Sequence, residues 1–375
     1  MKRRMNRKNQ KSIWIIGALS SVLLAILIFI GIRLQKQEPD VYYFEEEMSS
    51  EETDDEMSET AEEAETLQED EEVSTQPEEI IYPEPEYEFA TEEVTLAIEG
   101  LGREYTIAWV SDLHLVSDHE AGEELGDVHG EYLDAINKRY EEMAVTSDGV
   151  HAEELWPEIV KYLNYNDFDG IIFGGDMMDY CSNSNIEIIK EGLDSLHVPY
   201  IYVRADHDYG AYYGGVFFTE TEARELHKTI DGDEISYKFW DMGEFIVLGI
   251  DNSTKDMPEY YLNMVADVYT RGKPVIMATH VPYESKVDNS LAELSMQVRN
   301  TIYYWSDVSN HYKPNVITRQ YLDLIYSEDT VVKQVLSGHM HAGWDGMITQ
   351  QVSQHVFNPA YLGYIGIIHV VPASE

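Results

Sequence analysis

Aspartate, histidine or both stand directly after a short apolar run at five places in this 375-residue chain. Their order is Asp-x-His, Gly-Asp, Asp-His-Asp, a lone His before Val-Pro, and Gly-His-x-His. Carboxylate oxygens and imidazole nitrogens suit Zn, Mn or Fe. One ion would leave several of these groups unused, so the set favours two metals roughly 3.5–4 Å apart that share one carboxylate. The residues concerned are Asp112, His114, Asp176, Asp206, His207, Asp208, His280, His339 and His341.

The elements that must position these side chains follow an α/β pattern from about Val94 onward. The five apolar runs, "YTIAWV", "GIIFGG", "PYIYVRA", "KPVIMAT" and "VKQVLSG", are typical of buried strands and alternate with segments of helical period. Ligands of open α/β sheets gather beyond the carboxyl ends of the strands, so the five polar endings are expected to converge. The predicted helices are Ala152–Asn164, Asn185–Leu196, Glu220–Thr229, Pro258–Tyr269 and Thr318–Ser327.

Taken in order, the five motifs resemble those of the calcineurin-like metallophosphoesterases, over about Glu104 to Ala373. The resemblance implies a two-sheet β-sandwich flanked by helices. It also implies an enzyme that hydrolyses phosphomonoesters or phosphodiesters with a water bridging two divalent metals, of which Mn, Fe and Zn are the candidates. Phosphodiesters, nucleotide or sugar-nucleotide pyrophosphates and lipid-linked phosphates are all left open as substrates.

The resemblance also implies roles for single residues. Asp112, His114 and His341 would bind the first metal, and Asp176 would bridge to the second. Asp206, His280 and His339 would complete the second metal. His207 matches the histidine that contacts the substrate phosphate and protonates the leaving oxygen. Asp179 and Asp208 are expected to support the site from behind the ligands.

One motif departs from the family pattern, because Ala205-Asp206 stands where the family has Gly-Asn. Asp206 offers a side-chain oxygen of similar reach and adds a negative charge. The sequence therefore predicts an active site with an altered metal preference. The alternative interpretation is a non-catalytic metal-binding or sensor domain derived from a phosphoesterase.

The N-terminal part of the chain differs from the rest. Residues 1–12 are basic, and Ile13–Ile32 are twenty uncharged, mostly apolar positions. This length spans a bilayer, and the basic flank favours a cytoplasmic N-terminus. The sequence thus predicts a single-pass cell-membrane anchor at 13–32 with the catalytic domain outside the cell, the alternative being a cleaved signal peptide.

Residues 33–93 form an acidic segment, with no Lys or Arg between Lys36 and Arg103. Like charges repel and remain solvated, so a disordered linker is predicted, either a spacer or a tail that binds cations or a basic partner. The folded domain is predicted at 94–375.

The overall charge excludes some functions. A net charge of −46 is incompatible with a phosphate-backbone-binding surface, so nucleic acid is not an expected partner. Cys181 is the only cysteine, which excludes a disulfide within the chain.

Leu115–Gly149 and Pro282–Lys313 are the expected substrate-selecting segments. Among the remaining histidines, His355 is kept as a candidate site residue, while the substrate-binding residues and the oligomeric state are left open.

Overall fold

A computed structural model describes residues 82–117, 137–142, 144–210, 220–231, 237–254 and 257–373. These residues belong to the compact unit Gln76–Glu375, while Met1–Thr75 form a separate unit. The predicted cytoplasmic tail, the membrane anchor and the linker up to residue 81 lie outside the described residues. Within the described ranges, no helix combines the length and the apolar character that a membrane crossing requires.

The first sheet contains five strands in the order β1-β11-β2-β3-β4. The strands β2, β3 and β4 run parallel, as expected for strands joined by helical crossovers. The last strand, β11, lies antiparallel to β2 and parallel to the edge strand β1. The bounds are β1 Ala90–Ile98, β2 Tyr105–Val110, β3 Gly170–Phe173, β4 Tyr200–Tyr202 and β11 Tyr364–Pro372.

The second sheet contains six strands in the order β5-β6-β7-β8-β10-β9. Its centre, β6 to β10, is parallel, and β5 and β9 add antiparallel edges. Every residue of β6 and β7 is buried, which explains why these strands read as continuous apolar runs. The bounds are β5 Tyr237–Asp241, β6 Ile246–Ile250, β7 Val275–Thr279, β8 Val332–Ser337, β9 Trp344–Met347 and β10 Ser353–Val356.

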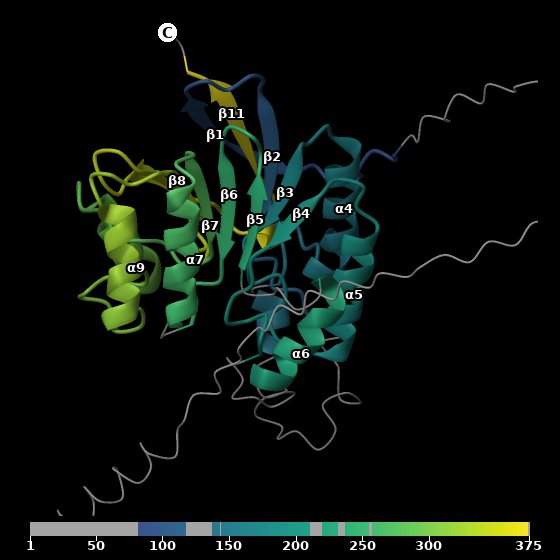
Figure 1. The fold of residues 1–375 in the computed structure, drawn as a ribbon. Coiled ribbons are helices and arrows are strands. Elements are labelled where there is room, and N and C mark those ends of the chain that lie inside the picture. Colours follow the sequence, from purple (N-terminus) through teal and green to yellow (C-terminus); the bar gives the residue numbers. More distant parts are fainter. Residues whose placement is uncertain are drawn as a thin grey trace, which may run out of the picture. The chain divides into compact units, whose positions relative to one another are not determined.

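The two sheets pack face to face, and helices cover their outer faces (Figure 1). Trp109 and Ile172 from the first sheet share one apolar cluster with Val247 and Ile276 from the second. Helices α4 and α5 contribute to the cluster on the outer face of the first sheet, and α7 and α9 to that of the second. The predicted two-sheet sandwich flanked by helices is therefore confirmed. The helices are α4 Ala152–Tyr165, α5 Asn183–Asp194, α6 Glu220–Asp231, α7 Glu259–Thr270, α8 Ser290–Arg299 and α9 Val316–Tyr326.

The predicted helices are all present, with ends that differ by at most two residues. Residues 137–142 and α8 are further helical segments that the sequence pattern did not predict. The expected domain start, Val94, falls inside β1, and Tyr87 just before β1 already donates its backbone N–H to Glu158 of α4. Part of the acidic segment is thus built into the sandwich.

Candidate metal centre

Five loops at the carboxyl ends of strands meet at one edge of the sandwich. Those after β2, β3 and β4 come from the first sheet, and those after β7 and β8 from the second. Beside a third group made of His114, Asp179 and His207, their side chains form two groups in which the possible ligand atoms lie within 4.8 Å of one another. We call these the Asp112 group, made of Asp112, His114 and His341, and the Asp176 group, made of Asp176, Asp206, His280 and His339. The structure therefore brings together all seven side chains that the sequence placed at the metals.

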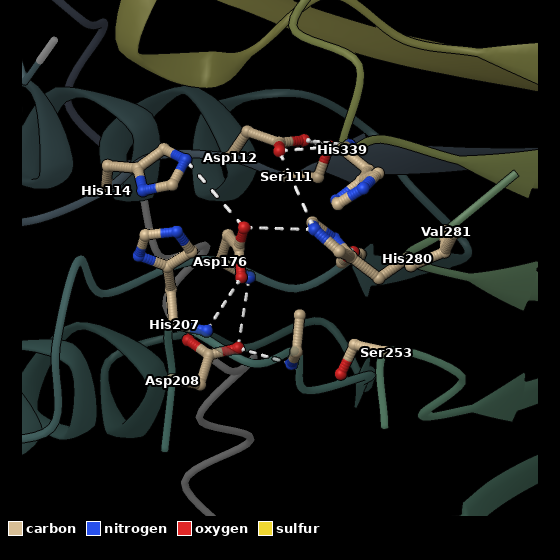
Figure 2. Close-up of polar contacts among 12 residues, drawn as sticks. Ser111, Asp112, His114, Asp176, His207, Asp208, Ser253, His280, Val281 and His339 are labelled. Carbon is tan, nitrogen blue, oxygen red and sulfur yellow. Dashed lines mark hydrogen bonds and ion pairs between the residues drawn. The ribbon is translucent and has the colours of Figure 1, made fainter. Parts of the chain in front are cut away.

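Asp176 lies between the two groups (Figure 2). Its Oδ2 is 3.0 Å from Nε2 of His280 and 3.8 Å from Nε2 of His114. Nε2 of His114 is also 3.0 Å from Nε2 of His341, so both imidazoles face the same point. This is the position that the sequence assigned to a bridging carboxylate.

The backbone at these residues is unusual. Six non-glycine residues in the described ranges have a positive φ, and five of them belong to the two groups: Asp112 (54°), His114 (50°), Asp176 (52°), His339 (70°) and His341 (54°). A left-handed conformation costs a non-glycine residue about 1 kcal/mol, and such costs concentrate at functional sites. The surrounding hydrogen bonds must hold these residues in place.

Close packing between the loops requires glycine at two positions. A Cβ on Gly338 would lie 2.1 Å from Oδ2 of Asp112, and one on Gly175, where φ is 93°, would lie 2.8 Å from Nδ1 of His280. Asp112 accepts hydrogen bonds from the hydroxyl of Ser111 and the backbone N–H of His339. The absence of a side chain at Gly338 thus lets the two sheets share one carboxylate.

Hydrogen bonds fix which imidazole nitrogen faces the centre. Nδ1 of His280 lies 2.8 Å from the carbonyl oxygen of Gly174, and Nδ1 of His114 lies 2.9 Å from Oδ1 of Asp179. Both contacts place the proton on Nδ1 and leave the lone pair on Nε2. A carboxylate or carbonyl behind a histidine is the usual arrangement at protein metal sites.

Buried atoms without partners show that the centre fits cations. Oδ1 of Asp206 and Nε2 of His339 are buried and have no hydrogen-bond partner among the described residues. Unpaired buried polar atoms are costly, and coordination would satisfy them. The donors, three carboxylates and four imidazoles, also match the preference of Zn, Mn and Fe.

The electrostatics point in the same direction. Burial opposes protonation of His280, yet the carboxylates of Asp176 and Asp112 raise its pKa to about 10. Burial likewise opposes ionisation of Asp112, yet the charge of His280 holds the pKa of that carboxyl below its usual range. The cluster thus stabilises positive charge, and metal binding would release protons from it.

The sequence profile described as calcineurin-like phosphoesterase matches residues 105–343, more than half of the chain. The chain belongs to the calcineurin-like phosphoesterase family. All five motifs lie within this match, and the family's dependence on two metals agrees with the two ligand groups. No curated protein sequence matches this phosphoesterase.

The solved structures similar to this phosphoesterase include the following three. A dimetal phosphatase from Danio rerio is 10% identical, with 69% of this chain and 88% of that chain covered and a TM-score of 0.41. Purple acid phosphatase PPD1 from yellow lupin (Lupinus luteus) seeds is 12% identical, with 69% and 44% covered and a TM-score of 0.39. GAP50, the anchor in the inner membrane complex of Plasmodium, is 12% identical, with 68% and 72% covered and a TM-score of 0.37.

His207 lies beside the Asp112 group and lines the pocket in front of both groups. Its Nδ1 lies 2.9 Å from the carbonyl oxygen of Asp179, which places a proton on Nδ1 and turns Nε2 away from this carbonyl. Burial opposes protonation, yet Asp176 and Asp179 raise the pKa of His207 to about 10. The ring is therefore held in one orientation, as a proton donor to a bound substrate requires.

Asp179 lies behind both His114 and His207. Its carboxylate contacts Nδ1 of His114 and accepts hydrogen bonds from Nε and Nη2 of Arg139, at 2.7 and 2.5 Å. Burial would raise its pKa, but the Arg139 guanidinium and the two imidazoles hold the pKa of Asp179 well below its usual range. The structure places Asp179 in contact with His114, whereas Arg139 was not among the residues that the sequence singled out.

Asp208 connects the loops after β3 and β4. Its carboxylate accepts backbone N–H groups from Asp176, Met177, Met178 and Ala205 and the hydroxyl of Tyr202, at 2.8–3.1 Å. It is fully buried. Its position explains how Asp176 and Asp206 are kept at a fixed separation.

We expect Asp208→Asn to lower the free energy of unfolding of the metal-free protein by about 3 kcal/mol. An asparagine NH₂ would face backbone N–H donors and leave several of them unsatisfied, at about 1–3 kcal/mol each. Urea unfolding followed by circular dichroism measures the change. Asp329→Asn, in an exposed loop, is the matched control. A variant as stable as this control would contradict the role assigned to Asp208.

Asp206 is nearly buried, and burial together with the charge of Asp176 raises its pKa. Because ionisation of this carboxylate is unfavourable in the metal-free protein, a nearby cation would stabilise its ionised form strongly. We expect Asp206→Asn to weaken metal binding by about 10- to 100-fold and to change the order of preference among Mn, Fe and Zn. Metal content after dialysis against each ion measures this, with the exposed Asp267→Asn on α7 as control. An unchanged metal content together with unchanged turnover would refute the prediction.

Several functional side chains were not found by sequence reasoning. The pocket has about 480 Å³ of empty space, part of it open to solvent, and is lined by Arg139, Arg299 and Tyr303 in addition to predicted residues. Asn252, after β6, accepts the backbone N–H of His280 at 3.1 Å. None of these four residues belongs to one of the five motifs. Arg139, Arg299 and Tyr303 do lie in the two segments expected to select the substrate.

The other histidines are not in the ligand groups as far as the structure describes them. His355 on β10 was kept as a candidate site residue. Its Nδ1 lies 3.4 Å from Oδ1 of Asp345 on β9, and its ring packs against Phe357. His227 is buried in α6 and contacts the backbone of Asp208. His119 and His129 lie outside the described residues.

Proposed function

We propose that this protein is a membrane-anchored, outward-facing phosphoesterase that uses two metal ions to hydrolyse phosphate esters. The observation that supports this most strongly is the convergence of seven donor side chains, five of them buried, in two groups around Asp176. The strained backbone at five of them indicates that the fold is shaped around this site.

The Asp112 group and the Asp176 group would hold one ion each, with Asp176 between them. Bound there, the metal pair would supply Lewis-acid activation of the phosphoryl group and of the attacking water. The chain's own residues do the rest. Asp208 fixes Asp176, Gly338 allows Asp112 to reach the second sheet, and Asp179 orients His114 and His207.

His207 would supply the proton that the leaving alkoxide requires. Its Nδ1–H is committed to the carbonyl of Asp179, so Nε2 is the atom available to a substrate in the pocket. Burial opposes protonation of the ring, but Asp176 and Asp179 raise the pKa of His207 to about 10, so the imidazole carries the proton at neutral pH. The proton on Nε2 can therefore be delivered without reorganisation of the ring.

The anchor and its orientation rest on the N-terminal sequence. The apolar run Ile13–Ile32 follows a basic segment, and the acidic residues that follow carry charges that keep them in water. Membrane fractionation, followed by protease treatment of intact cells, tests both points. A chain recovered from the soluble fraction, or one protected from external protease, would refute this part of the proposal.

The enzymatic part is tested on the full chain, purified in detergent, stripped of metal and reloaded with Mn, Fe, Zn or Mg separately. A phosphomonoester and a phosphodiester serve as substrates, with Asp112→Ala as the inactive reference. Metal-dependent turnover that is lost in Asp112→Ala is the expected result. Tight metal binding without turnover on any phosphate ester would favour the sensor function instead, and failure to bind any metal would exclude both.

A further inference from the structure

Arg299 is a cation without an acidic partner in a very acidic domain. Residues 82–375 contain 51 Asp and Glu but only 17 Lys and Arg. Among the described residues, five arginines form ion pairs with carboxylates, and Arg299 forms none. Arginines in such a domain find an acidic partner easily, so the absence of one at Arg299 calls for an explanation.

The position of Arg299 supplies that explanation. It is the last residue of α8, its Nη2 donates to the carbonyl oxygen of His339 at 2.8 Å, and its side chain lines the pocket. Its Nε is buried and has no hydrogen-bond partner among the described residues. A buried guanidinium donor of this kind is costly unless a ligand satisfies it.

The surroundings hold Arg299 toward the pocket. Its guanidinium lies 5.3 Å from the ring centroid of Tyr303, and Tyr303 stacks on His339 at 4.4 Å with an interplanar angle of 12°. Asn300, directly after it, has a φ of 55° and ends the helix. The guanidinium is thus fixed beside the Asp176 group without being a ligand itself.

Arg139, the other arginine of the pocket, has a different task. Both its Nε and its Nη2 donate to the carboxylate of Asp179, so its charge is largely compensated within the protein. Arg139 positions His114 and His207 through Asp179. Arg299 has no such carboxylate among the described residues, which leaves its charge available to an anion in the pocket.

The chemistry of phosphate esters indicates which anion this is. A phosphomonoester carries a charge of about −1.5 to −2 at neutral pH and has three acceptor oxygens. A phosphodiester has only one charge and two such oxygens. Guanidinium groups bind phosphate oxygens with short, strong hydrogen bonds.

We propose that Arg299 binds the additional charged oxygen of a phosphomonoester and makes the site prefer monoesters to diesters. This inference rests on the proposed function, because it concerns the substrate class of the same site. It gives Arg299 the role of a substrate-binding residue that determines specificity.

The test compares Arg299→Gln, Arg299→Lys and unmodified full-length protein, all loaded with the same metal. The substrates are p-nitrophenyl phosphate and bis(p-nitrophenyl) phosphate. We expect Arg299→Gln to lower kcat/KM about 50-fold for the monoester and about fivefold for the diester, mainly through KM. Arg299→Lys should recover part of the monoester activity. Arg319→Gln, which removes an exposed arginine paired with Asp307 on the surface, is the matched control.

Equal losses on both esters, or no loss in Arg299→Gln, would overturn the inference. A second measurement does not depend on turnover. Calorimetry should show that Arg299→Gln raises the Kd of inorganic phosphate about 50-fold and that of dimethyl phosphate far less. If the unmodified protein hydrolyses neither ester, the proposed function fails. An unchanged Kd for inorganic phosphate would still refute the role of Arg299 in that case.

Discussion

Replacing Asp176 with asparagine will lower the turnover of phosphate esters by at least about 1000-fold and reduce the bound metal below two ions per chain. A factor of 1000 corresponds to about 4 kcal/mol in the activation free energy, which is within what a metal pair contributes to phosphoryl transfer. Oδ2 of Asp176 lies 3.0 Å from Nε2 of His280 in its own group and 3.8 Å from Nε2 of His114 in the Asp112 group. The neutral amide would place an NH₂ where a cation is needed.

Stopped assays at saturating metal, together with metal analysis after dialysis, test this prediction. The variant should remain folded, because asparagine has the same shape and the burial of Asp206 beside Asp176 already disfavours two charges there. Asp208→Asn differs from Asp176→Asn, because it is expected to lower the stability of the metal-free protein. An Asp176→Asn variant that keeps two ions and a tenth of the turnover would show that Asp176 does not bridge the groups.

Replacing His207 with alanine will lower kcat about 1000-fold for an alkyl phosphate while leaving both metal ions bound. General acid catalysis contributes about 10²- to 10⁴-fold, and the contribution grows with the basicity of the leaving group. For p-nitrophenyl phosphate, whose leaving group is stable as an anion, the loss should be about ten times smaller. His207 is not a member of the Asp112 group or the Asp176 group, so metal content should not change.

Glycerol 2-phosphate and p-nitrophenyl phosphate provide the two leaving groups, and metal analysis provides the independent measurement. His369→Ala, at a partly exposed histidine on β11, is the matched control. Equal losses on the two substrates would show that His207 only binds the phosphate and does not donate the proton. Loss of one metal ion would assign His207 to coordination instead.

The positions of the ligands could be predicted because they depend on topology. Asp112, Asp176, Asp206, His280 and His339 each follow a buried strand, and strands of this kind end at a common edge. The pairing into two groups could not be derived from spacing and came from the family resemblance.

Other features of the site could not be predicted, because they depend on contacts between distant loops. The left-handed backbone at His339 is stabilised by the hydrogen bond from its N–H to Asp112, far away in the chain. Arg299 has no motif around it, and α8, which carries it, has only two buried residues and a weakly amphipathic pattern. Charge alone also put the start of the folded domain at Val94, whereas β1 begins at Ala90. In β1 only Val94 and Ile98 are buried, so an edge strand reads like part of the acidic segment.

The place of β11 in the first sheet has a consequence for how the protein acquires its structure during synthesis. β11, the last strand of the described residues, lies between β1 and β2, the first two of them, so that Tyr364 pairs with Ala90 and Val370 with Tyr105. Until β11 has emerged from the ribosome, β2 lacks one of its neighbours in the described sheet and β1 lacks the only one that the described strands supply. Such long-range closure is slow compared with local pairing.

The segment just before β11 is tied to the same event. Ala360 and Tyr361 donate backbone hydrogen bonds to the carbonyl oxygens of Ser111 and Asp112. The loop that carries Asp112 is therefore completed only when Ala360 and Tyr361 dock. A nascent chain holds the other metal ligands before His339 and His341 are made, yet the centre is complete only once this segment has emerged from the ribosome.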